Sequence, residues 1–282
     1  MYCDLHTHST CSDGADTPTV LAEKAAEAGL SAVALTDHNT TRGLDEFLSA
    51  CEKQGIVGVP GVELSTYYKG TEFHISALFV KKEFYNDIML KVERFQVLKE
   101  KSNIEICERL AADGYDISYS DIKEKYPDSR INRFHIAEKL METGVVSSVD
   151  EAMKGLLSDK NKYYTPPERL QSLEVVSYIK SIGAISVLAH PMIKVDKSIV
   201  DEFLSEAVPL GLDAMEVIYT EYDDEKTREA KQLAEKHGIL PSGGSDYHGV
   251  SKPGVYLGKG RGNLAIPMDL YRGLAAKYEQ SL

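Results

Sequence analysis

The stretch CDLHTHSTCSDG, residues 3–14, begins as a short apolar run typical of a strand and ends in a cluster of polar side chains. Side chains of a strand alternate between its faces, so His6 and His8 point to the same side while Thr7 points to the other. Asp13 follows five residues after His8. Two imidazoles side by side on one face are stable together when they share a metal ion, so the positions of the remaining histidines decide what this pair does.

The composition is that of a soluble globular protein. Of 282 residues, 43% are hydrophobic and 27% are charged, which suffices for a sizeable core. No apolar run approaches the ~18–20 residues of a membrane span, and no basic segment followed by an apolar one opens the chain. The four cysteines have no CxxC spacing, which favours reduced thiols. We therefore expect a cytoplasmic protein that does not interact with membranes.

The formal net charge of −12 restricts the partners. Such a charge argues against a protein that coats long duplex nucleic acid through a basic face. A small anionic substrate stays compatible with it, because bound divalent cations make a pocket locally positive.

Apolar runs typical of strands alternate with segments of helical period along most of the chain. This alternation predicts a mostly parallel sheet, and about seven strands without a glycine-rich phosphate fingerprint favour a closed barrel. Between the fourth and fifth strands the pattern is helical throughout. We predict an α/β fold, a distorted (β/α)7 barrel of TIM-like type formed by residues 1–82 and 168–282, with an all-α insertion at 83–167 after strand four.

Six of the eight histidines are predicted to lie in strands or just after them. The carboxyl ends of barrel strands converge on one mouth, where such barrels carry out their chemistry. A single histidine at a strand end is usually an ordinary polar residue, but six of eight in such places are not expected by chance. The set, with three carboxylates from the same loops and strands, comprises His6, His8, Asp13, His38, Glu63, His74, His190, Asp246 and His248.

These nine side chains offer nitrogen and oxygen ligands without a thiolate. They exceed the four ligands of one tetrahedral ion, so we predict two or three divalent cations at the barrel mouth. Imidazole combined with carboxylate does not select sharply among Mn, Fe and Zn.

The motifs DLHTHS, TDH, AHP and SDYH resemble, in this order, the four signatures of the polymerase and histidinol phosphatase (PHP) family of metal-dependent phosphoesterases. The resemblance implies three ligand groups in which Glu63 bridges the first two. The first would comprise His6, His8, Glu63 and Asp246, the second Glu63, His74 and His190, and the third Asp13, His38 and His248.

Two features are similar to the branch of this family that acts on nucleoside monophosphates, bisphosphates and short oligonucleotides. One is Asp13, where some members have histidine, and the other is the helical insertion. The segment INRFHIA resembles that branch's phosphate-binding site and implies substrate contacts from Arg133 and His135. Asn39 departs from the pattern, because that branch often has an aspartate there and an amide cannot act as a base.

The resemblance implies a hydrolase that cleaves phosphoric esters, a phosphatase or phosphodiesterase, through a metal-bridging hydroxide. Glu63, His190 and Asp246 would be its catalytic residues, and Asp37 could orient a metal-bound histidine. The expected partner is a small phosphorylated substrate: a nucleoside 5′-monophosphate, a 3′,5′-bisphosphate or a short oligonucleotide. Alternatives are a histidinol or sugar phosphate phosphatase, a metal-dependent amidohydrolase, and a PHP module without catalysis.

Overall fold

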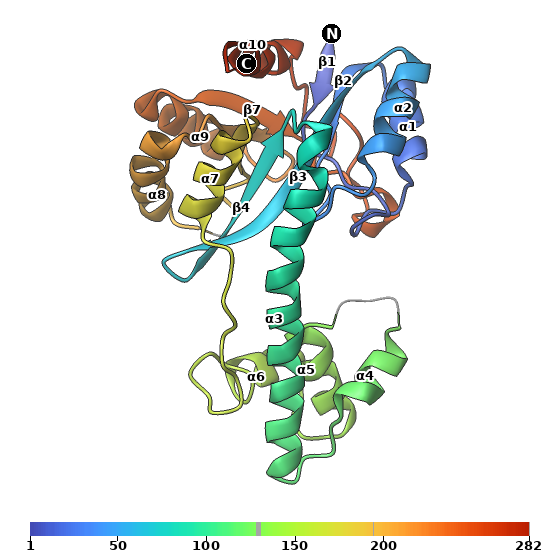
Figure 1. The fold of residues 1–282 in the computed structure, drawn as a ribbon, viewed down its shortest axis with the longest axis vertical. Coiled ribbons are helices and arrows are strands. Elements are labelled where there is room, and N and C mark those ends of the chain that lie inside the picture. The colour runs from blue at the N-terminus through green and yellow to red at the C-terminus, as the bar shows by residue number, and fades with distance from the viewer. Residues whose placement is uncertain (128–130, 194, 282) are drawn as a thin grey trace. The chain divides into compact units, whose positions relative to one another are not determined.

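The computed structural model describes residues 1–127, 131–193 and 195–281. The chain forms two compact units, one of Met1–Leu90 with Leu170–Leu282 and the other of Lys91–Arg169. Figure 1 shows the sheet and its surrounding helices in the first unit and a group of helices in the second. The helical insertion predicted at 83–167 lies mostly within the second unit.

A seven-stranded sheet, with its strands in chain order, forms the core of the first unit. The strands are β1 (Tyr2–Asp4), β2 (Leu30–Leu35), β3 (Val57–Tyr68), β4 (Thr71–Leu78), β5 (Ile185–Ala189), β6 (Ala214–Tyr219) and β7 (Leu240–Gly244). Leu5, just after β1, donates its N–H to the carbonyl of Gly243 in β7 at 3.2 Å, and beyond the two strand ends Asp246 donates its N–H to the carbonyl of His6 at 2.9 Å. These bonds bring the first and last strands together, and the predicted TIM-like barrel is confirmed.

β4 is the exception to the parallel arrangement, because it pairs antiparallel with both β3 and β5. β3 and β4 form a hairpin that turns at Lys69 and Gly70. Glu63 lies inside β3, which continues to Tyr68. Because Ser65 pairs with His74 and Glu63 with Ser76, the Glu63 and His74 side chains lie diagonally on one face of the hairpin.

Helices surround the barrel in the first unit. They are α1 (Pro18–Glu27), α2 (Leu44–Gln54), α7 (Ser172–Ser181), α8 (Lys197–Leu210), α9 (Asp224–His237) and α10 (Met268–Gln280), with 3-10 turns η1 (Lys82–Phe84) and η2 (Gly249–Ser251). The start of α1 is stabilised by its sequence: Pro18 occupies the first turn, and the Thr17 side chain accepts the N–H of Val20. The apolar faces of α1 and α2 pack around Phe47, which is fully buried.

The second unit contains most of α3 (Tyr85–Ala112) together with α4 (Tyr119–Lys125), α5 (Arg133–Glu142) and α6 (Val149–Lys154). It has a hydrophobic core of its own, in which Ile106, Leu110, Ile136 and Leu140 are fully buried. Despite the length of α3, the structure contains, within its described ranges, no helix long and apolar enough to cross a membrane.

Candidate active site

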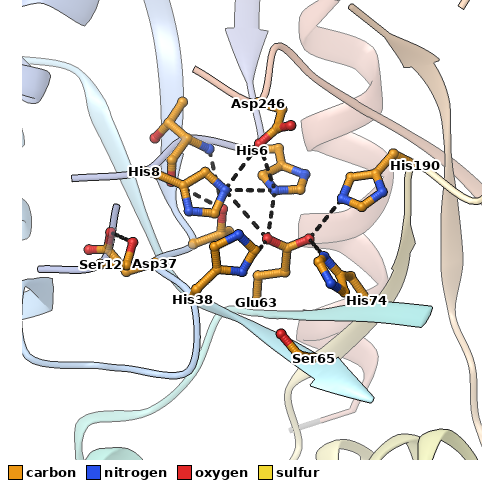
Figure 2. Close-up of polar contacts among 12 residues, drawn as sticks. His6, His8, Ser12, Asp37, His38, Glu63, Ser65, His74, His190 and Asp246 are labelled. Atoms are coloured by element: carbon orange, nitrogen blue, oxygen red, sulfur yellow. Dashed lines mark hydrogen bonds and ion pairs between the residues drawn. The ribbon is translucent and has the colours of Figure 1, made fainter. Parts of the chain in front are cut away.

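The nine predicted ligand residues converge at one end of the barrel. They come from six segments of the chain: the loops after β1 and β2, the strands β3 and β4, and the loops after β5 and β7. Figure 2 shows the imidazoles of His6, His8, His38, His74 and His190 directed toward the Glu63 carboxylate. β4 runs antiparallel to its neighbours, and His74, in its first half, pairs with Ala189 at the end of β5, which places His74 at the mouth.

Glu63 is fully buried, and its two oxygens face different imidazoles. Oε1 lies 2.9 Å from His74 Nδ1 and 3.0 Å from His190 Nε2. Oε2 lies 3.2 Å from His6 Nε2, 3.4 Å from His8 Nε2 and 3.0 Å from His38 Nδ1. A carboxylate placed in this way is suited to bridge two cations.

His6 and His8 approach each other nitrogen to nitrogen, with 3.0 Å between their Nε2 atoms. Oδ1 of Asp246 lies 3.2 Å from His8 Nε2 and 3.6 Å from His6 Nε2. Nδ1 of His6 must donate to Glu216, whose Oε1 lies 3.0 Å away, because a carboxylate only accepts. Nε2 of His6 therefore faces His8, and once this nitrogen loses its proton its lone pair can bind a shared cation.

A third group lies around Asp13. Oδ1 of Asp13 is 3.2 Å from His248 Nε2 and 3.8 Å from His8 Nδ1, and Oδ2 is 3.8 Å from His38 Nε2. Nδ1 of His248 is 2.9 Å from the Asp246 carbonyl and donates to it, which leaves the Nε2 lone pair available to a cation. One ligand atom from each of these four residues lies within 4.8 Å of the others.

Unpartnered polar atoms test whether these residues fit metal ions. Among the described residues, buried Nδ1 of His8, Nδ1 of His38 and Oε2 of Glu63 have no hydrogen-bond partner. Buried polar groups are normally satisfied, and a nitrogen or oxygen lone pair without a hydrogen bond can be satisfied by a cation. The residues present therefore fit divalent metal ions.

The pKa directions of His8 and Glu63 agree with this fit. Burial lowers the pKa of His8 to about 3, so its imidazole is neutral at neutral pH. Burial alone would raise the pKa of Glu63, but the neighbouring charges of His38 and His6 hold it well below its usual range. Metal ligands must be neutral imidazoles or ionised carboxylates, and both residues are in that form. For His6 and His74, burial alone would lower the pKa, but the neighbouring Glu63 carboxylate raises it, so a cation that binds there displaces a proton.

Carboxylates behind the ligand residues hold them in place. Glu216, on β6, accepts the N–H of His190 at 2.7 Å through Oε2, in addition to its contact with His6. Our sequence interpretation missed Glu216. The available signal was an acidic residue inside the apolar strand segment AMEVIY, where a charge is expensive unless it has partners.

We expected Asp37 to orient a metal-bound histidine, but its contacts give it a different role. Its carboxylate accepts the N–H of Ser9 at 2.7 Å and the hydroxyls of Ser9 and Ser12 at 2.6 Å. Asp37 therefore holds the loop that carries Asp13. Figure 2 shows the contact between Asp37 and Ser12 beside the histidines.

Three residues at the mouth have positive φ angles that non-glycine residues rarely adopt: Asn39 at 54°, His190 at 33° and Asp246 at 54°. Asn39 is tied to β3, since its side chain donates to Ser65 Oγ at 3.1 Å and accepts from Ser65 N at 3.2 Å. Strained backbone persists where the surroundings hold it, and it clusters at functional sites.

Arg133 and His135 lie in the helical unit, at the first turn of α5. Arg133 donates to the Leu157 carbonyl at 2.8 Å and to Asp159 Oδ1 at 2.6 Å, and its guanidinium lies 4.0 Å from the centre of the Tyr164 ring. His135 caps its own helix, because its Nδ1 accepts the N–H of Asn132 at 3.1 Å. Arg133 therefore contacts the segment that follows α6, whereas His135 contacts the backbone at the start of its own helix.

Comparison with known proteins agrees with this geometry. The PHP domain family matches residues 4–164. A 5′-3′ exoribonuclease of Haemophilus influenzae is 30% identical over 250 residues, covering 87% of this chain and 89% of the relative. A 3′,5′-nucleoside bisphosphate phosphatase of Chromobacterium violaceum is 26% identical over 285 residues, covering 97% of this chain and 96% of the relative.

A crystal structure of a predicted metal-dependent phosphoesterase from Bifidobacterium adolescentis has the same fold, with a TM-score of 0.72 and 28% identity. The match covers 98% of this chain and 96% of that chain. The chain therefore belongs to the PHP family of metal-dependent phosphoesterases.

Proposed function

We propose that this protein hydrolyses phosphoric esters of nucleotides with the help of two or three divalent cations held by the nine side chains at the barrel mouth. The observation that carries the proposal is the position of Glu63, whose two oxygens face separate groups of imidazoles. We assign His6, His8, Glu63 and Asp246 to the first cation, Glu63, His74 and His190 to the second, and Asp13, His38 and His248 to the third.

When bound, such cations supply a nucleophile at neutral pH and compensate charge on the phosphoryl oxygens. The chain's own residues provide the positioning. Glu63 and Asp246 set the spacing between ligand groups, while Glu216 directs Nε2 of His6 toward the site through its contact with Nδ1. We propose that Glu63, His190 and Asp246 act at the reacting phosphate, with no covalent phospho-enzyme.

For the substrate we propose a nucleoside 5′-monophosphate, a 3′,5′-bisphosphate or a short oligonucleotide. The names of the similar proteins, an exoribonuclease and a bisphosphate phosphatase, support this class. We further propose that Arg133 and His135 contact the substrate phosphate, since a guanidinium can hold a phosphate by two parallel hydrogen bonds. The protein is proposed to act in the cytoplasm.

A phosphate-release screen with Mn²⁺ tests this proposal. The substrates are AMP, a 3′,5′-bisphosphate, a 5′-phosphorylated trinucleotide, histidinol phosphate and a sugar phosphate, each with and without EDTA. Mass spectrometry of the trinucleotide reaction separates loss of the terminal phosphate from release of nucleotides. We expect turnover of at least one nucleotide substrate that EDTA abolishes.

Preference for histidinol phosphate or a sugar phosphate would contradict the proposed substrate class. Metal-loaded protein that cleaves none of these esters would contradict the catalytic proposal and favour a PHP module without catalysis. The Glu23→Gln variant is a suitable control, because Glu23 is exposed on α1.

A further inference from the structure

The two carboxylate oxygens of Asp246 have different surroundings. Oδ1 faces the imidazoles of His6 and His8, as described above. Oδ2 points away from them and accepts two hydrogen bonds, one from the Tyr219 hydroxyl at 2.8 Å and one from Lys252 Nζ at 2.7 Å. Oδ2 is thus already engaged, and Oδ1 is the oxygen that Asp246 can offer to a cation.

Tyr219 and Lys252 also contact each other. Nζ of Lys252 donates to the Tyr219 hydroxyl oxygen at 3.3 Å, so that the three side chains form a closed ring of hydrogen bonds. Tyr219 ends β6 and is buried, whereas Lys252 follows the short turn η2 and is partly exposed. The ring therefore ties the loop after β7 to a rigid strand of the barrel.

The backbone of Asp246 explains why its side chain needs such support. Its φ angle of 54° lies in the left-handed region that non-glycine residues avoid, so the local conformation is not self-sustaining. The N–H of Asp246 is bonded to His6 O, which fixes the backbone but not the carboxylate. The carboxylate is fixed by the residues that contact Oδ2.

Lys252 also places a positive charge next to a carboxylate of the site. Within the described part of the chain, Lys252 is the only lysine or arginine paired with Asp13, Glu63 or Asp246. A charge-assisted hydrogen bond of 2.7 Å is strong and directional, and it favours the ionised carboxylate that a metal requires.

We propose that Tyr219 and Lys252 are positioning residues that hold Asp246 as a one-oxygen ligand directed at His6 and His8, and that this ring sets the affinity of the first cation group. The inference rests on the metal-binding part of the proposed function. It assigns to Lys252 a role in metal affinity, distinct from direct contact with the substrate.

The test measures Mn²⁺ binding to the full-length apoprotein by calorimetry and by electron paramagnetic resonance, together with kcat and KM. In Lys252→Met and Tyr219→Phe we expect the dissociation constant of one class of Mn²⁺ sites to rise about 10- to 100-fold, the range seen when outer contacts of ligands are lost. Lys252→Arg keeps the charge and a donor and should recover most of the affinity. Saturating Mn²⁺ should restore kcat in the two weakened variants without a change in KM.

Lys259→Met is the matched control, because Lys259 is exposed in the same loop, and its Mn²⁺ affinity should equal that of the wild type. Unchanged Mn²⁺ affinity in both Lys252→Met and Tyr219→Phe would overturn the inference. A raised KM with unchanged metal affinity would also overturn it and assign Lys252 to the substrate. If one variant fails to fold, as its thermal transition shows, the other decides.

The outcomes also separate this inference from the proposed function. A wild-type protein that binds Mn²⁺ but cleaves no phosphoester contradicts the function and leaves the affinity comparison intact. Wild-type protein that binds no Mn²⁺ contradicts both.

Discussion

Glu216 lies directly behind His6, with its Oε1 3.0 Å from Nδ1 of the imidazole, and both side chains are almost completely buried. The contact determines which nitrogen carries the proton and leaves Nε2 directed at His8. A buried carboxylate in this position also makes the imidazole a more basic ligand. The same carboxylate holds the backbone of His190, so one residue of β6 supports two proposed ligands.

Glu216→Gln tests this support. The amide keeps the shape, but it can accept only one of the two hydrogen bonds that Glu216 accepts, and the negative charge is lost. We expect the dissociation constant for Mn²⁺ to rise about tenfold while the fold is retained. Calorimetric titration measures the constant, and circular dichroism checks the fold. Wild-type affinity would show that the charge of Glu216 does not tune His6.

Glu63→Gln removes the carboxylate that faces both groups of imidazoles. We expect metal and activity to be lost together, with kcat/KM reduced about 100-fold or more, equivalent to about 2.7 kcal/mol of transition-state stabilisation. Elemental analysis of the purified protein counts the ions, and the phosphate-release assay measures turnover. Glu23→Gln is the matched control, and wild-type turnover in Glu63→Gln would refute the bridging role.

Asp37→Asn should loosen the loop that carries Asp13. In the wild type, the N–H and the hydroxyl of Ser9 each donate to one carboxylate oxygen of Asp37. In the variant an amide nitrogen replaces one of these oxygens, so one buried donor loses its acceptor. We expect the free energy of unfolding to fall by about 1–3 kcal/mol, as measured by urea denaturation. Asp45→Asn is the control, because Asp45 pairs with Lys82 on the surface. Equal stability of the two variants would contradict the role of Asp37.

Arg133→Ala tests the proposed substrate contact from the helical unit. We expect KM for terminal phosphomonoesters to rise about tenfold, equivalent to about 1.4 kcal/mol of binding, with kcat little changed. Steady-state kinetics give both constants. Arg94→Ala, an exposed arginine on α3, is the control. Because Arg133 also bonds Leu157 and Asp159, the thermal transition of the variant is recorded, and unchanged kinetics would remove Arg133 from the substrate site.

The sequence predicted the barrel and the convergence of the nine polar side chains because both depend on local patterns. Strand and helix periods determine the order of elements, and a barrel brings residues such as His38 and His190 to one mouth. The direction of β4 was outside this reasoning, because strand pairing is a long-range property. His74 was therefore expected beside the other histidines, but the structural cause was not foreseen. That cause is the hairpin of β3 and β4, which reverses the direction of the strand.

The sequence by itself determined the class of chemistry, since imidazoles and carboxylates without thiolates at predicted strand ends select for shared divalent cations. Only the tertiary structure decided how these ligands are supported. Glu216, Tyr219 and Lys252 form no motif in the chain, and they act through contacts with His6 and Asp246, which lie far away in sequence or across a turn. Such contacts arise when separate strands close into a barrel, and a local pattern does not record them.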